Sequence, residues 1–268
     1  MADDVMIDRR LVSNATGSIF DRQALTEALL NADSQAARQD FCRKAAARLA
    51  NVASWFSVDA FLDGGDVPAS WHLSMADARQ DPDRHAAFLG AATVVQIASE
   101  LSSGTIALLD AGHHYAAAAL RRQLIETEYL VEAFADDFGR AADWLRASPT
   151  EVRRGYPPRI MRELGGFSNS EYRTHCAHGG HPAPEGRHLL KFTAAHSPID
   201  DELWRASSWG DLAQHLRRVW SSVCRLLAAQ HARFVVVRSD DIRAVDDVEN
   251  RWMATDPIAQ GVSLSSQE

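Results

Sequence analysis

Apolar residues recur every three to four positions along most of the chain, which is the spacing of one face of an α-helix. Two such stretches lie at 20–30 and 34–55, and a third starts near Arg84. The third is small or aliphatic at almost every position, which predicts a helix that is buried on most sides. The pattern therefore predicts an all-α protein, a helical bundle with an N-terminal helical hairpin.

Local signals set several helix boundaries. A further helix is predicted at about 114–136, after a turn at Gly112. Ser148 and Ser168 are each followed by a glutamate three residues later, the spacing of a capping box, so each is expected to start a short helix. Ser208 is expected to cap the last long helix.

The same signals divide the chain into four parts. Residues 1–57 are interpreted as a helical hairpin, and 58–83 as a linker or long loop because this stretch contains a glycine pair and two prolines. Residues 84–237 are expected to form the bundle that carries an Arg/His-rich segment. Residues 238–268 are acidic and weakly periodic, which predicts a partly ordered tail.

Composition excludes some classes of protein. A hydrophobic content of 46% suits a folded core, and a net charge of -8 argues against nonspecific coating of nucleic acid. The three cysteines, Cys42, Cys176 and Cys224, lack CxxC spacing, so a reducing compartment is expected. The N-terminus is acidic, and no continuous apolar run reaches about 18 residues. We therefore expect a cytoplasmic protein without a membrane segment.

The helix at 114–136 carries charges that favour a structural interpretation. Arg121, Arg122, Glu126 and Glu128 are expected to form an exposed, ion-paired face. Such pairs contribute a few tenths of a kcal/mol each.

The segment from Ser168 to Pro182, SNSEYRTHCAHGGHP, holds most of the candidate chemistry. Arg173 and His178 stand five residues apart, so on a helix both could reach one phosphate. The arginine would supply a fixed cation and the histidine a group that titrates near neutrality, and metal-independent RNA cleavage needs this pair. Tyr172 could orient a substrate, although a half-buried anchor is the more ordinary role. Residues 151–199 contain seven Arg or Lys against four Glu, which would attract a polyanion. The candidate substrate-binding residues are Arg153, Arg154, Arg159, Arg162, His175 and His181.

Two other interpretations of the segment stay open. His175, His178 and His181 repeat every third residue and could bind zinc, with Cys176 as an additional soft donor. Alternatively, Arg173 and His178 are helix-surface and capping residues at the Gly-Gly stop. No cofactor is expected for the RNA-cleaving interpretation, and zinc for the metal-binding one.

A helix reading AAAALRRQLIETEYLVEAFADD, followed about forty residues later by EYRTHCAHGGHP, resembles a group of bacterial helical proteins. In that group an LRxLxE helix precedes a Y-x-x-x-S/C-x-x-x-H segment, and the group is similar to the HEPN superfamily. The resemblance covers roughly residues 84–230. The HEPN signature is an arginine, a polar residue and a histidine, here Arg173, Thr174 and His178. Thr174 departs from the asparagine or aspartate that is common there.

The resemblance implies a bundle that forms a homodimer and brings two Arg/His pairs to one cleft. It implies a metal-independent ribonuclease of a toxin or antiviral defence system, with a cognate antitoxin or defence partner. Arg173 would stabilise the developing phosphorane charge, and His178 would act as general acid or base.

The sequence therefore leads to a HEPN-like RNA-cleaving or RNA-binding protein as the first hypothesis. The alternative is a non-catalytic helical sensor or interaction module whose histidines bind a metal or shape a contact surface. A purely structural role of the segment is the third interpretation.

Overall fold

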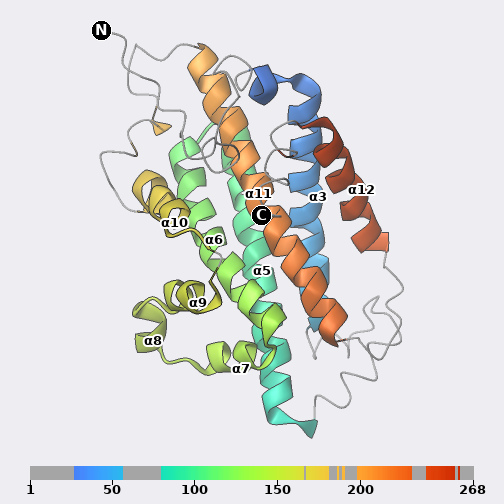
Figure 1. Ribbon diagram of the computed structural model, residues 1–268, viewed down its shortest axis with the longest axis vertical. Helices are drawn as coiled ribbons and strands as arrows, with labels where there is room; N and C mark the ends of the chain where they lie inside the picture. Colours follow the sequence, from blue (N-terminus) through green and yellow to red (C-terminus); the bar gives the residue numbers. More distant parts are fainter. Residues whose placement is uncertain are drawn as a thin grey trace.

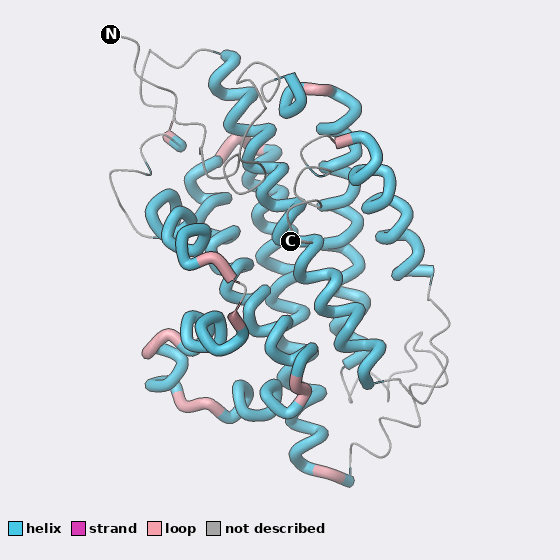
Figure 2. Tube along the Cα trace, in the orientation of Figure 1, coloured by secondary structure: helices cyan, strands magenta, loops and turns pink. Residues whose placement is uncertain are grey.

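The computed structural model describes residues 27–56, 80–165, 167–180, 186, 189–190, 198–230, 240–256 and 259. Nearly all of these residues are helical, and Figure 2 shows no strand among them. The predicted all-α bundle is confirmed. The predicted linker lies almost entirely outside the described residues, as does the first helix of the predicted hairpin before residue 27.

Among the described residues, the bundle contains long helices and several short helical elements that pack on them. The long helices are α3 (Ala32–Phe56), α5 (Pro82–Asp110), α6 (His114–Asp136), α11 (Pro198–Gln230) and α12 (Asp240–Thr255). The short elements are α7 (Gly139–Arg146), α8 (Pro149–Arg153), α9 (Tyr156–Leu164), α10 (Asn169–His175) and the π-helical turn η1 (Cys176–Gly180).

Helix α11 runs diagonally across the molecule in Figure 1. Helix α11 packs against α3, α5 and α6, and α12 packs on the outer side of α3. Helices α9 and α10 and the turn η1 lie against α6, while α7 packs on α5. Segments that are far apart in the sequence therefore meet along α6 and α11.

One hydrophobic core joins α3 to the other long helices. Phe41 of α3, Phe88 of α5, Leu124 of α6 and Trp220 of α11 belong to the same buried cluster. Helix α3 therefore shares its core with the other long helices. Its apolar stripe needs the faces of α5 and α11 for burial.

Helix α12 lies within residues 238–268, the segment expected to form a partly ordered tail, and it packs on the core. Trp252 is buried and stacks on Phe41, with 5.0 Å between ring centroids. Asp256, just after the helix, accepts hydrogen bonds from Trp252 Nε1 at 2.8 Å and from buried Arg38 at 2.7 and 2.9 Å. Helix α12 has a short apolar stripe among its acidic residues, and this stripe is buried in the core. The acidic composition of the segment therefore does not indicate how it packs.

The helix starts predicted at Ser148 and Ser168 agree with the structure, and the start predicted at Ser208 does not. Ser148 and Ser168 each accept a hydrogen bond from the backbone N–H of the glutamate three residues later. Gly112 has a φ of 75°, which suits glycine in the turn between α5 and α6. Ser208, by contrast, lies inside α11, which begins ten residues earlier at Pro198. Proline is favoured in the first turn of a helix, and α11 starts at Pro198 rather than at the serine.

Helix α5 is the one helix of the described chain that is long and apolar enough to cross a membrane. Its buried residues, including Phe88, Val94 and Leu109, belong to the core shared with α3, α6 and α11. The apolar character of α5 thus accompanies its place in the bundle core, as its pattern of small and aliphatic residues predicts.

Candidate functional site

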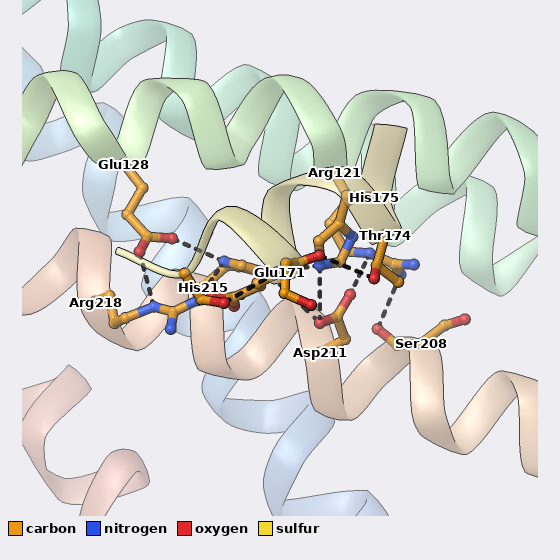
Figure 3. A network of polar contacts seen from close by, with 11 residues as sticks. Arg121, Glu128, Glu171, Thr174, His175, Ser208, Asp211, His215 and Arg218 are labelled. Carbon is orange, nitrogen blue, oxygen red and sulfur yellow. Dashed lines mark hydrogen bonds and ion pairs between the residues drawn. The ribbon is translucent and has the colours of Figure 1, made fainter. Parts of the chain in front are cut away.

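Two helices each present an acidic residue and a histidine to one another. Helix α10 carries Glu171 and His175, and α11 carries Asp211 and His215. A spacing of four residues places both members of a pair on one helical face. The two faces meet beneath α6, which contributes Glu128 (Figure 3).

The ring nitrogens of the two histidines converge on one carboxylate oxygen. His175 Nε2 lies 3.4 Å from His215 Nε2, and each of these atoms lies 3.5 Å from Asp211 Oδ1. Glu171 Oε1 is 3.8 Å from His215 Nε2. Glu171, His175 and His215 each offer a ligand atom, and these atoms lie within 4.8 Å of one another. The cluster therefore has the donor set of a metal site.

The three converging atoms, His175 Nε2, His215 Nε2 and Asp211 Oδ1, form a triangle, and residues outside it hold the other ring nitrogen of His215 and the other oxygen of Asp211. His215 Nδ1 lies 2.7 Å from Glu128 Oε2, and both side chains are buried. Arg121 Nε pairs with Asp211 Oδ2 at 2.6 Å, while Arg121 Nη1 donates to the carbonyl of Ser208. Asp211 Oδ1 is therefore the carboxylate oxygen that faces the histidines.

Arg218 closes one side of the cluster. Its Nε pairs with Glu128 Oε1 and its Nη2 donates to Glu171 Oε1, each at 2.7 Å. The same Nη2 lies 2.8 Å from His215 Nδ1. The side chains of Arg218 and Glu171 are 41% and 30% exposed, whereas His175 and Asp211 are 11% exposed and His215 is buried. The cluster meets solvent where Arg218 and Glu171 lie.

The two histidines differ in charge because their surroundings differ. Burial lowers the pKa of His175 to about 4, so its ring is neutral near pH 7. Burial and Arg218 also act to lower the pKa of His215, but Glu128 and Asp211 outweigh them and raise it to about 9. Burial opposes ionisation of Asp211, yet His175, Arg121 and His215 hold its pKa well below the usual range. His175 thus offers a lone pair.

A second polar group lies on the adjacent stripe of α10. Tyr172 donates its hydroxyl hydrogen to Glu126 Oε1 at 2.8 Å, and Arg122 donates to the same oxygen at 2.7 Å. Arg122 Nε lies 3.4 Å from Cys176 Sγ. Burial raises the pKa of Tyr172 to about 12, so its hydroxyl stays protonated. The helix and the segment that together carry the resemblance therefore touch in space.

The predicted catalytic pair is placed differently from the cluster. Arg173 is exposed on α10, and His178 is half-buried in the turn η1. Tyr172 belongs to the group around Glu126, and its half-buried position matches an anchoring role. His181 lies outside the described residues.

The predicted substrate-binding residues fall into two sets. His175 joins the buried cluster, whereas four arginines are exposed on α8, α9 and the turn between them: Arg153, Arg154, Arg159 and Arg162. Arg159 lies over the ring of Tyr156, with its guanidinium carbon 4.5 Å from the ring centroid. Of the two described members of the predicted zinc-binding trio, His175 and His178, His175 takes part in the convergent group, and its partners there are Glu171 and His215.

Several members of the cluster were not predicted as functional. Arg121 and Glu128 are buried at 7% and 1% exposure, so the expectation that they form an exposed face is wrong. Their ion-pair partners on α11 lie outside their own helix, so the spacing within α6 misleads. Asp211 and His215 repeat the four-residue spacing of Glu171 and His175, which is the signal that could have revealed them.

No protein-family model, curated protein or solved structure matches this chain. Function is therefore inferred from the geometry and chemistry of the cluster.

Proposed function

We propose that this protein is a helical module that binds one divalent transition metal ion, zinc first, through His175, His215 and Asp211. Tetrahedral zinc lies about 2.0–2.1 Å from histidine nitrogens, so neighbouring ligand atoms are about 3.3–3.4 Å apart. The three atoms of the cluster are 3.4, 3.5 and 3.5 Å apart. This triangle, which needs almost no rearrangement to hold an ion, is the observation that carries the proposal.

The contacts around the triangle support the same proposal. Histidines that bind metals commonly donate their other ring N–H to a carboxylate, which fixes the tautomer and the ring orientation. Glu128 stands in that place for His215. Arg121 holds the outer oxygen of Asp211, so the inner oxygen keeps its direction. These partners would orient the ligands before an ion arrives.

Charge allows a cation to take the place of a proton in this cluster. The carboxylates of Glu128, Glu171 and Asp211 face the guanidinium groups of Arg121 and Arg218 and the ring of His215, whose raised pKa keeps it protonated near pH 7, so the charges balance without an ion. Buried charges are costly unless they are compensated. Because a histidine must lose its proton to bind a metal, a dication would replace the proton of His215 and bind the two neutral nitrogens.

A bound ion would tie α10 to the bundle, which suits a sensor or interaction module. Helix α10 has seven residues and none of them is fully buried. Helices this short depend on tertiary contacts for their stability. Because His175 lies on α10 and the other two ligands, Asp211 and His215, lie on α11, the metal would determine where α10 sits.

The test is the metal content of protein purified without a histidine tag. We expect one zinc per chain, and loss of at least about 90% of it in His215→Ala and in His175→Ala, because each removes one of three ligands. His113→Ala is the matched control, since His113 is exposed at the start of α6. A wild-type protein that binds no zinc, cobalt or nickel when titrated at pH 7 would leave the cluster as a structural ion-pair network.

We also propose, as a second candidate, that the protein cleaves or binds RNA in the HEPN-like manner. Two observations support it. The helix that carries Arg122 and the segment that carries Tyr172 lie against each other, and α8, α9 and α10, with their exposed arginines, lie along one side of the molecule in Figure 1. Polyanions are attracted to such cationic surfaces.

The RNA proposal is tested by cleavage of total RNA in the presence of EDTA, with His178→Ala as the informative variant. Wild type should cleave, and His178→Ala should lose cleavage while its circular dichroism is unchanged. Equal cleavage by the two proteins contradicts the catalytic assignment. Binding without cleavage that weakens in Arg153→Ala/Arg154→Ala would support an RNA-binding role alone.

A further inference from the structure

One corner of the proposed metal site is less constrained than the others. The triangle of His175, His215 and Asp211 has edges of 3.4–3.5 Å, whereas Glu171 Oε1 stands 3.8 Å from His215 Nε2. Three protein ligands leave one position of a tetrahedral ion for a further group. Among the described residues, Glu171 offers a carboxylate oxygen for this position, and it stands farther from His215 than Asp211 does.

The same corner is the one that reaches solvent. Glu171 and Arg218 are the two most exposed members of the cluster. Asp211 and His215 sit on the 33-residue helix α11, whose apolar stripe is buried, so they are held by the core. Glu171 belongs to the short helix α10, which has no fully buried residue. Displacing Glu171 therefore disturbs little of the core.

Arg218 would remain in place if Glu171 moved. Its Nε is held by buried Glu128 at 2.7 Å, and its Nη2 donates to Glu171 Oε1. A guanidinium group binds carboxylates and phosphates through paired N–H groups. The carboxylate of Glu171 thus lies where an external oxyanion would sit, between the metal position and a fixed guanidinium.

Charge permits such an exchange once the metal is bound. With a dication, the cluster of three carboxylates and two guanidinium groups has one excess positive charge. If Glu171 withdrew, the excess would be two. A singly charged anion entering this corner would return the excess to one, and a doubly charged phosphate would cancel it.

We propose that Glu171 is an exchangeable ligand, and that an external oxyanion, a carboxylate or phosphate group, takes its place on the metal beside Arg218. This inference rests on the proposed metal binding. The protein would then respond to a small acidic ligand by releasing the Glu171 side chain, while His175 keeps α10 attached to the metal.

The test uses cobalt(II)-loaded full-length protein, because the visible spectrum of cobalt(II) reports a change of ligand. Acetate and phosphate are titrated separately, so that the two sources of an oxyanion are distinguished. We expect a saturable spectral change with at least one of them. In Glu171→Ala the metal should be retained, and the anion should bind about tenfold tighter or more, because the competing carboxylate is gone.

Arg218→Met should weaken the same anion about tenfold or more, since one charge-assisted hydrogen bond is lost. Glu163→Ala, which removes an exposed glutamate on α9, is the matched control and should behave as wild type. Loss of cobalt from Glu171→Ala, or an unchanged wild-type spectrum with both anions, would overturn the exchange. Wild-type protein that binds no metal would overturn both this inference and the function beneath it.

Discussion

Glu128 shows how much one side chain can determine without being a proposed metal ligand itself. It lies within 2.7 Å of both His215 Nδ1 and Arg218 Nε, although it is placed on a different helix from either. Its two oxygens therefore orient one proposed ligand and one anion-binding group. The remaining members of the cluster depend on its charge as well as on its position.

At this scale we predict that Glu128→Gln lowers zinc affinity about 10- to 100-fold while the stoichiometry stays at one, as for other outer-shell partners of metal ligands. Competition with a chromophoric chelator measures the affinity. Glu132→Gln, one turn further along α6, is the control, since Glu132 pairs with Arg225 near the surface. Equal affinities of the two variants would show that Glu128 does not support the site.

The residues of the cluster could be predicted from sequence only in part. Ser168 and Glu171 predict the start of α10, because a helix cap is a contact between residues three apart in the sequence. His175 could be chosen as a candidate because it lies in a histidine-rich segment. Two partners of His215, His175 and Glu128, are 40 and 87 residues away in the chain. Only the packing of α6, α10 and α11 brings them together, and no local pattern encodes that packing.

At the scale of elements, the turn η1 depends on how closely it approaches α6. A Cβ atom on Gly179 would stand 2.5 Å from the carbonyl carbon of Ala118 and 2.7 Å from its Cβ. Backbone cannot yield to such a contact as a flexible side chain can. The absence of a side chain at Gly179 therefore sets the distance of η1, and of α10 before it, from α6.

We predict that Gly179→Ala destabilises the protein by about 1–3 kcal/mol, the usual cost of overpacking, and weakens zinc binding because α10 shifts. Urea denaturation and chelator competition measure the two effects. Gly210→Ala is the control, because its Cβ would find no atom closer than 3.9 Å and alanine favours a helix. If Gly179→Ala unfolds at the wild-type urea concentration, the close approach is not required.

At the scale of the whole molecule, α12 is joined to α3 by an ion pair that solvent does not reach. Arg38 Nη2 lies 2.7 Å from Asp256 Oδ2, with side-chain exposures of 0% and 2%. Arg251 and Asp40 connect the same two helices at 2.8 Å on the surface, with exposures of 63% and 40%. The chain thus contains a buried and an exposed pair across one interface.

We predict that Asp256→Ala destabilises the protein by about 3–5 kcal/mol, since it leaves Arg38 buried and uncompensated. Asp40→Ala should cost no more than about 1 kcal/mol. The free energy of unfolding in urea, measured on metal-free protein, compares the two. Similar small losses in both variants would mean that α12 can leave the bundle without unfolding the rest.

Metal removal should also lower the stability of the whole protein. A ligand that binds only the native state stabilises it by about 2.7 kcal/mol at a free concentration 100 times its Kd. We predict that zinc raises the thermal midpoint of wild type and that EDTA reverses this. His215→Ala should show no shift with either treatment. An identical response of wild type and His215→Ala would place any bound zinc elsewhere.

The order of the cluster along the chain also constrains when it can be completed during biosynthesis. Glu128, Glu171 and His175 leave the ribosome well before Asp211 and His215, because α11 comes late in the sequence. A nascent chain that ends before α11 has a single histidine of the proposed site and an uncovered α6. Metal loading at this site therefore has to follow synthesis of α11, and a chain truncated before residue 211 has no way to acquire it.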